Sequence, residues 1–134
     1  MLRMLKNSFK AIQEHYDYQF SKPSHQWDSE ENKHQFVQLF YSLLEPVEQL
    51  LKKEATIIKL SAPTYVLGDL HGNYKDLMFF EESFWKFGVK LCPANILFLG
   101  DFVDRGPHSV ELVAYLFANK VLQPKKWFLL RGNQ

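Results

Sequence analysis

The pattern of apolar and polar positions predicts helices in the first part of the chain. Residues 1–20 carry apolar side chains at steps of three and four, and a second stripe of this kind runs over residues 36–51. Such spacing places apolar side chains along one face of a helix. The polar segment 21–33 between them predicts a linker, in which Ser29 is a candidate N-cap. We expect a kink or a break at Pro46, because proline lacks the amide hydrogen that a helix interior needs.

From residue 56 onward, short apolar runs alternate with helical patterns. The predicted strands are Thr56–Leu60, Thr64–Leu67, Ile96–Leu99 and Trp127–Leu130, and the predicted helices are about Tyr74–Phe87 and Ser109–Asn119. Strands that alternate with helices of this length indicate parallel βαβ crossovers. The predicted fold class is therefore α/β, with a parallel βαβαβ core and a helical N-terminal segment.

Polar loops follow the last three predicted strands. Their sequences are Gly68-Asp69-Leu70-His71-Gly72, Gly100-Asp101-Phe102-Val103-Asp104-Arg105-Gly106 and Leu130-Arg131-Gly132-Asn133. Loops at the carboxyl ends of parallel strands meet at one edge of the sheet. Each motif alone has a plainer explanation, such as turn chemistry or an ion pair between Asp104 and Arg105. Three of them in one order favour a site for manganese, iron or zinc, which accept mixed oxygen and nitrogen ligands.

Together these motifs resemble the N-terminal signatures of the phosphoprotein phosphatase (PPP) family of serine/threonine phosphatases, in the calcineurin-like metallophosphoesterase superfamily. The flanking segments Ala55–Pro63 and Phe128–Leu130 agree with that resemblance. It implies the N-terminal half of a metallophosphoesterase β-sandwich flanked by helices, over residues 36–134. Residues 1–35 would then form a helical extension and linker. A half-sandwich would leave apolar side chains uncovered on one face of its sheet.

The resemblance also implies a role for each matching residue. The implied metal ligands are Asp69 and His71 for the first ion, Asp101 as a bridge, and Asn133 for the second ion. Arg105 would clamp the substrate phosphate through its planar guanidinium. Asp104 would orient a general-acid histidine. Two divalent ions about 4 Å apart would activate a bridging water for in-line attack on phosphorus.

The implied activity is metal-dependent hydrolysis of phosphoserine and phosphothreonine on proteins, with phosphoprotein substrates and regulatory subunits as partners. Two departures weaken that activity in this chain. Gln134 stands where the family has its general-acid histidine, and losing general-acid help costs about 10²–10⁴-fold. Two metal-binding histidines, a second arginine and a second sheet come from the family's C-terminal half. We therefore expect the chain alone to be inactive or weakly active.

Two alternatives to a protein phosphatase stay open. One is a non-catalytic fragment or pseudophosphatase that binds partners, which the truncated motif favours. The other keeps the metal chemistry but hydrolyses a dinucleoside polyphosphate or another small phosphoester, which the first two motifs do not exclude. We expect none of the remaining histidines, His108 included, to be a metal ligand.

Composition narrows the partners and the compartment. With 16 basic and 15 acidic residues the formal net charge is +1, which gives no electrostatic reason to expect nucleic acid or a membrane as partner. The single cysteine, Cys92, cannot form an internal disulfide, so we expect a reducing, cytoplasmic or nuclear location. The basic segment Met1–Lys10 is typical of a surface helix and, less often, of a transit peptide.

Overall fold

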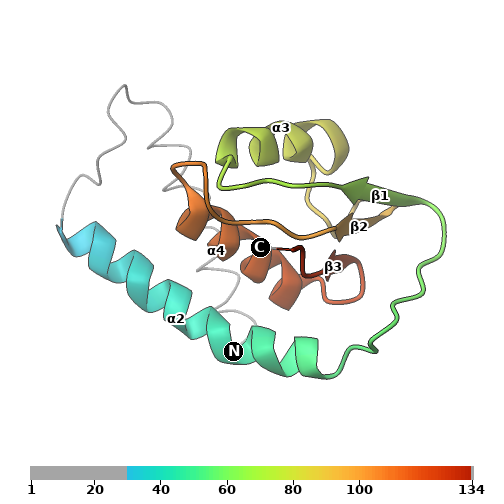
Figure 1. Cartoon of the computed structure of the whole chain (residues 1–134), viewed down its shortest axis with the longest axis horizontal. Helices are drawn as coiled ribbons and strands as arrows, with labels where there is room; N and C mark the ends of the chain where they lie inside the picture. The colour runs from blue at the N-terminus through green and yellow to red at the C-terminus, as the bar shows by residue number, and fades with distance from the viewer. Residues whose placement is uncertain (1–29, 134) are drawn as a thin grey trace.

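The fold is a small parallel sheet with helices packed against it, seen in a computed structural model that describes residues 30–133 (Figure 1). Its elements in chain order are α2 (Glu30–Lys52), β1 (Thr64–Leu67), α3 (Tyr74–Phe84), β2 (Asn95–Phe98), α4 (Ser109–Leu122) and β3 (Trp127–Leu129). The α/β class and the parallel βαβαβ core predicted from the sequence are confirmed. Within the described range, none of the helices combines the length and the apolarity that a bilayer-spanning segment needs.

The three strands lie in the order β1-β2-β3, and both neighbouring pairs are parallel. Their register aligns Val66 with Leu97 and Leu97 with Phe128. Because the strand order follows the sequence, right-handed crossovers place α3 and α4 on the same face of the sheet. The opposite face is partly open, and Val66 there is 57% exposed. This agrees with the uncovered apolar face expected of a half-sandwich.

Aromatic side chains fill the core between the sheet and the two crossover helices. The rings of Trp127 and Trp85 meet edge to face, with centroids 5.4 Å apart, and Phe98 lies 4.8 Å from Trp127. The indole nitrogen of Trp85 donates a hydrogen bond of 3.0 Å to the hydroxyl of Tyr115. Burial, and secondly the charge of Glu81, raises the pKa of Tyr115 well above its ordinary value. The hydroxyl therefore stays neutral in the core.

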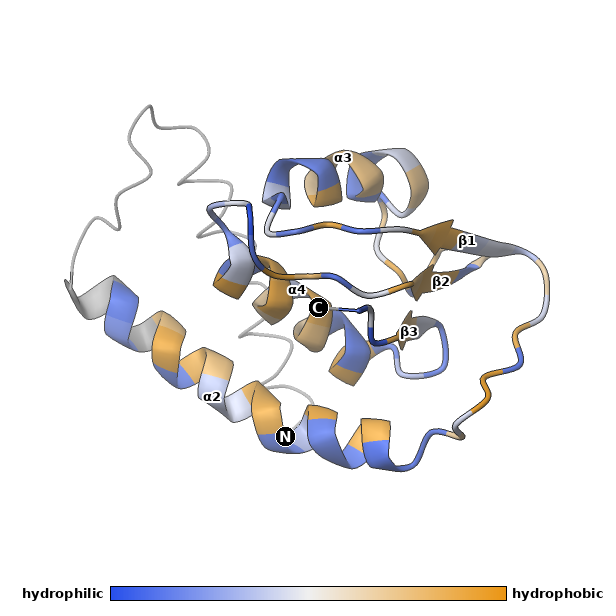
Figure 2. Cartoon of the chain, in the orientation of Figure 1, coloured by the Kyte–Doolittle hydropathy of each residue, from blue (hydrophilic) through white to orange (hydrophobic). Residues whose placement is uncertain are grey.

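Helix α2 forms an outer layer that packs on α4 (Figure 1). In Figure 2 the strands and much of α4 are orange, whereas α2 alternates between orange and blue turns, as expected of a helix with one covered face. Leu43 and Val47 are each only 2% exposed on its inner side. Just after α2, Glu54 forms an ion pair with Lys120 of α4, which is fully buried and also donates to the carbonyl oxygen of Trp127 at 2.9 Å.

Two predicted features of the N-terminal part are wrong. The segment Thr56–Leu60 forms no strand, since it connects α2 to β1 without a neighbouring strand that could accept its hydrogen bonds. Of the kink or break predicted at Pro46, the break does not occur, since α2 is one helix from Glu30 to Lys52. Burial of the flanking Leu43 and Val47 offsets the hydrogen bond that the proline removes.

The limits of several elements also differ from the prediction. Helix α3 ends at Phe84, because Trp85 leaves helical geometry (φ −138°) with its side chain buried. Helix α4 continues to Leu122, three residues beyond the prediction. Residues 30–33 belong to α2 and not to a linker. The helix predicted over residues 1–20 and the Ser29 cap lie outside the described residues.

The buried ion pair yields a test of the contact between α2 and α4. Replacing Lys120 by Met keeps most of the side-chain volume but removes the donor for Glu54 and for the carbonyl of Trp127. We expect Lys120→Met to lower the free energy of unfolding by about 1–3 kcal/mol in urea denaturation, because both acceptors lose their partner. The control, Lys125→Met, changes an exposed lysine and should stay within about 0.5 kcal/mol of the parent. Equal stability of both variants would contradict this account.

Candidate functional site

Hydrogen bonds hold together the loops that follow β1 and β2. We call residues 68–73 loop 1, residues 99–108 loop 2 and residues 130–133 loop 3. The backbone N–H of His71 donates to the carbonyl of Asp101 at 2.9 Å, and the N–H of Gly72 donates to Phe102 at 2.8 Å. In return, the N–H of Gly106 donates to the carbonyl of His71 at 2.8 Å. The two loops therefore form one unit at the carboxyl edge of the sheet.

Asp69, His71 and Asp101, three of the predicted metal ligands, come together on this unit. The Nε2 atom of His71 lies 3.8 Å from a carboxylate oxygen of Asp69 and 3.9 Å from one of Asp101. The potential ligand atoms of the three residues all lie within 4.8 Å of one another. We call this group the ligand trio. The side chain of Asp101 is only 6% exposed, whereas that of Asp69 is 64% exposed, so the trio opens to solvent on the Asp69 side.

The hydrogen bonds of His71 show which ring nitrogen is available. Its Nδ1 lies 2.8 Å from the carbonyl oxygen of Val103. A carbonyl only accepts, so Nδ1 carries the hydrogen and Nε2 presents its lone pair. That Nε2 is buried and has no hydrogen-bond partner among the residues that the structure describes. A buried acceptor without a partner is costly, and a histidine held through its other nitrogen is the usual arrangement of a metal ligand. The trio therefore fits a divalent ion.

Backbone strain is concentrated at the same place. Four residues without the freedom of glycine have a positive φ in the described range: His71 (42°), Asp101 (49°), Asp104 (67°) and Arg105 (63°). This left-handed conformation costs about 1–2 kcal/mol per residue. All four are residues that the sequence assigned to the site. Strain that persists in this way is typical of positions whose geometry serves a function.

Two glycines permit the close approach of the loops. A β-carbon on Gly106 would collide with the carbonyl oxygen of His71, so loop 2 can cross loop 1 only with glycine there. A β-carbon on Gly132 would collide with the carboxylate of Asp101 and lie 2.6 Å from its backbone nitrogen. Loop 3 is therefore pressed against Asp101, which brings Asn133, the next residue, to the same edge.

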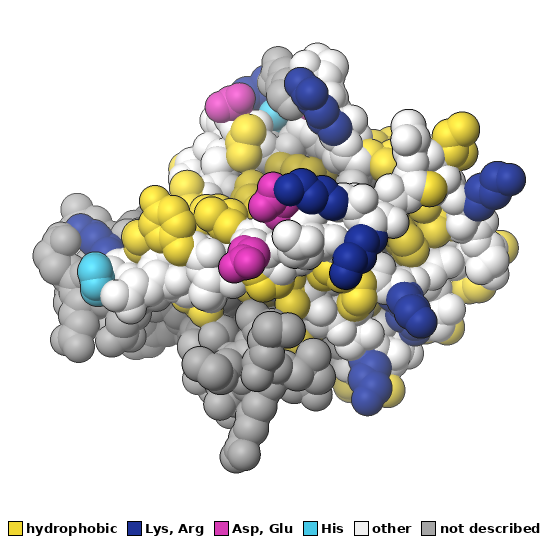
Figure 3. All heavy atoms as spheres, turned by 90° about the horizontal axis from the view of Figure 1, so that it is seen from below, with side chains coloured by type: hydrophobic (Ala, Val, Ile, Leu, Met, Phe, Trp, Pro, Cys, Tyr) yellow, Lys and Arg dark blue, Asp and Glu magenta, His cyan; other side chains and the backbone are white. Residues whose placement is uncertain are grey.

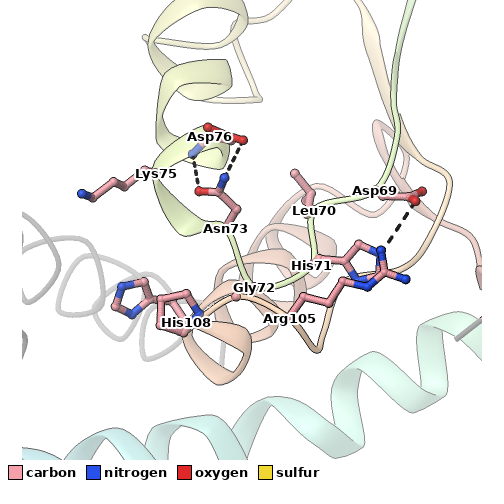
Figure 4. A pocket seen from close by; sticks show the side chains of 11 residues that line it. Asp69, Leu70, His71, Gly72, Asn73, Lys75, Asp76, Arg105 and His108 are labelled. Carbon is pink, nitrogen blue, oxygen red and sulfur yellow. Dashed lines mark hydrogen bonds and ion pairs between the residues drawn. The ribbon is translucent and has the colours of Figure 1, made fainter.

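A hollow of about 520 Å³ lies beside the trio, between the starts of α3 and α4 (Figure 4). The polar side chains that line it are Asp69, His71, Asn73, Lys75, Arg105 and His108, together with Asp76. Arg105 and His71 both line this hollow, and their side chains overlap in the view of Figure 4. A cation next to a potential metal position suits the binding of an anion such as phosphate.

The predicted residues Asn133 and Asp104 belong neither to the ligand trio nor to the lining of the hollow. Asn133 is exposed on loop 3, and its side chain makes no hydrogen bond within the described part of the chain. Asp104 is exposed at the turn before Arg105 and does not line the hollow.

Sequence reasoning did not find the carbonyl of Val103 that orients His71, because a backbone group has no signal of its own in the sequence. It also missed Lys75 as a lining residue, since nothing in the pattern marks that lysine.

Comparison with known proteins decides the family. The profile of the calcineurin-like phosphoesterases matches residues 62–133, more than half of the chain. The chain belongs to this family. A calcineurin-like phosphoesterase uses divalent metals, which agrees with the metal site that the trio offers.

A solved relative gives a finer comparison. The structure of a protein serine/threonine phosphatase from Saccharomyces cerevisiae, described as similar to human phosphatase PP5, is 34% identical to this calcineurin-like phosphoesterase, with a TM-score of 0.62. The similarity covers 72% of this chain and 31% of the yeast protein. The chain thus corresponds to less than a third of the length of that phosphatase.

The close contact at Gly132 yields a test of the site's geometry. We expect Gly132→Ala to weaken binding of Mn²⁺ about 10- to 100-fold in calorimetry, because the added methyl group displaces the carboxylate of Asp101. The matched control is Gly68→Ala, whose β-carbon would meet no atom within 4 Å, and which should bind Mn²⁺ like the parent. If Gly132→Ala bound Mn²⁺ as tightly as Gly68→Ala, the close contact of loop 3 would not hold the carboxylate of Asp101 in place.

Proposed function

We propose that this chain carries the metal-binding part of a phosphatase that hydrolyses phosphoserine and phosphothreonine on proteins by a two-metal mechanism. The observation that carries the proposal is the buried Nε2 of His71, which has no hydrogen-bond partner in the described range and lies near the carboxylates of Asp69 and Asp101. A ring nitrogen and two carboxylates are a suitable ligand set for manganese, iron or zinc. Membership of the calcineurin-like phosphoesterases supports the reaction class.

Each ligand has a distinct role in the proposed site. Asp69 and His71 hold the first ion, Asp101 bridges both ions, and Asn133 holds the second through its side-chain oxygen. The bridging role is supported by the position of Asp101, which lies between the imidazole of His71 and the backbone of Gly132. When bound, the ions supply Lewis-acid stabilisation and lower the pKa of a water for attack on phosphorus.

Arg105 binds the substrate phosphate in this proposal. It is exposed beside the trio and makes no ion pair within the described part of the chain, so its donors are available to two phosphate oxygens. Arg105 and Asp104 both have a positive φ, and of the two Arg105 lines the hollow. We assign Asp104 to orienting the group that protonates the leaving oxygen.

A protein is the proposed substrate, because the yeast relative is a protein serine/threonine phosphatase and is 34% identical. Regulatory subunits are the proposed partners. A cytoplasmic or nuclear location is also proposed, supported by the free thiol of Cys92. The open side of the trio at Asp69 is compatible with a phosphorylated side chain on a large molecule.

The metal assignment can be tested without activity. We expect Asp101→Asn to abolish binding of a second Mn²⁺ and to weaken the first at least about 10-fold in calorimetry, because an amide cannot bridge two ions as a carboxylate can. The control, Glu82→Gln, removes the same charge from an exposed position on α3 and should bind Mn²⁺ like the parent. Two ions bound to Asp101→Asn with parental affinity would refute the bridging role.

Activity separates the proposed function from its two alternatives. In a chain completed with a C-terminal half, we expect Mn²⁺-dependent hydrolysis of a chromogenic phosphate ester that Asp69→Asn removes, and faster turnover of a phosphopeptide than of a dinucleoside polyphosphate. The reverse preference would favour the small-phosphoester hydrolase. Complete inactivity of this completed chain, with Mn²⁺ still bound, would favour the partner-binding fragment.

A further inference from the structure

The hollow beside the trio has more room than one phosphate group needs. Its volume of about 520 Å³ corresponds to roughly 17 water molecules at about 30 Å³ each, whereas a phosphate has five heavy atoms. In Figure 4, Asp69 and Arg105 lie on one side of Gly72, and Lys75 and His108 lie on the other side. A phosphate bound at the trio and Arg105 therefore leaves the Lys75 end of the hollow free for another group.

A cationic side chain, Lys75, is available at that second end of the hollow. Lys75 is exposed and forms no ion pair with any residue of the described chain. The neighbouring carboxylate of Asp76 forms no ion pair with Lys75 in the described chain and accepts a hydrogen bond of 2.6 Å from the side chain of Asn73. The imidazole of His108 lies 4.0 Å from the carboxylate of Glu111. Lys75 is thus the available cation at this end.

The N-termini of the two crossover helices add partial positive charge at the hollow. Helices α3 and α4 both begin at the hollow. Their N-cap residues are Asn73, which directly precedes Tyr74, and His108. The N-terminus of a helix carries a partial positive charge.

From this arrangement we infer that Lys75 binds a second anionic group of the substrate and thereby determines specificity. The inference rests on the proposed function. The substrate class is a phosphopeptide with a carboxylate or a second phosphoryl group close to the phosphorylated residue. Arg105 holds the reacting phosphate, and the ammonium of Lys75, a point charge on a flexible stem, adapts to an anion at somewhat variable distance.

Two peptides that differ in charge test this inference by binding rather than by turnover. Both carry a non-hydrolysable phosphonate analogue of phosphoserine, flanked by glutamates in one peptide and by glutamines in the other. Calorimetry with the full chain and Mn²⁺ at about 0.05 M salt should show the glutamate peptide binding about fivefold tighter. The preference should shrink at about 0.5 M salt, because the charges are then screened.

Matched lysine variants locate the effect. Lys75→Gln should erase the preference while leaving the affinity for the glutamine peptide unchanged, whereas Lys125→Gln, an exposed lysine outside the hollow, should keep the preference. Equal affinity for both peptides in the parent, or an unchanged preference in Lys75→Gln, overturns the inference but leaves the proposed function standing. Failure of both peptides to bind in the presence of Mn²⁺ overturns the proposed function and the inference with it.

Discussion

The site depends on one backbone carbonyl. The carbonyl oxygen of Asp101 accepts hydrogen bonds from the N–H groups of Leu70 and His71, at 3.1 and 2.9 Å. These bonds fix loop 1 on loop 2 and so determine where the imidazole of His71 and the carboxylate of Asp101 meet. They also help to offset the left-handed backbone conformation of both residues, which would be unfavourable in isolated loops. The ligand trio is therefore a product of the contact between two loops.

The sheet supplies the rigid base that this contact needs. Parallel pairing places the ends of β1, β2 and β3 side by side, and buried aromatic side chains such as Phe98 and Trp127 hold the strands against α4. On the outside, Figure 3 shows lysine and acidic side chains around yellow apolar patches on the α2 side. In this domain the packed core provides stability, and the strained, polar edge of the sheet carries the groups for chemistry.

The two ends of the hollow differ in how firmly their side chains are held. At the trio, the buried Asp101 and the oriented imidazole of His71, with the exposed Asp69, present carboxylates and a lone pair, which suits an ion that tolerates little change in geometry. At Lys75 the group is exposed and flexible, which suits an anion whose distance varies between substrates. Arg105 combines both properties, because its side chain is exposed but its backbone has a strained, positive φ. Reaction and selectivity can thus be altered by different residues.

The sequence by itself determined the parallel βαβαβ core, the three polar strand ends and the identity of the candidate ligands Asp69, His71 and Asp101. These follow from local periodicity and from the rule that loops after parallel strands share one edge. Only the tertiary structure decided that Thr56–Leu60 is not a strand and that α2 passes through Pro46 without a break. It alone also showed that the carbonyl of Val103 selects the free nitrogen of His71. The physical reason is that these features depend on partners distant in the sequence, whose backbone groups carry no residue-specific signal.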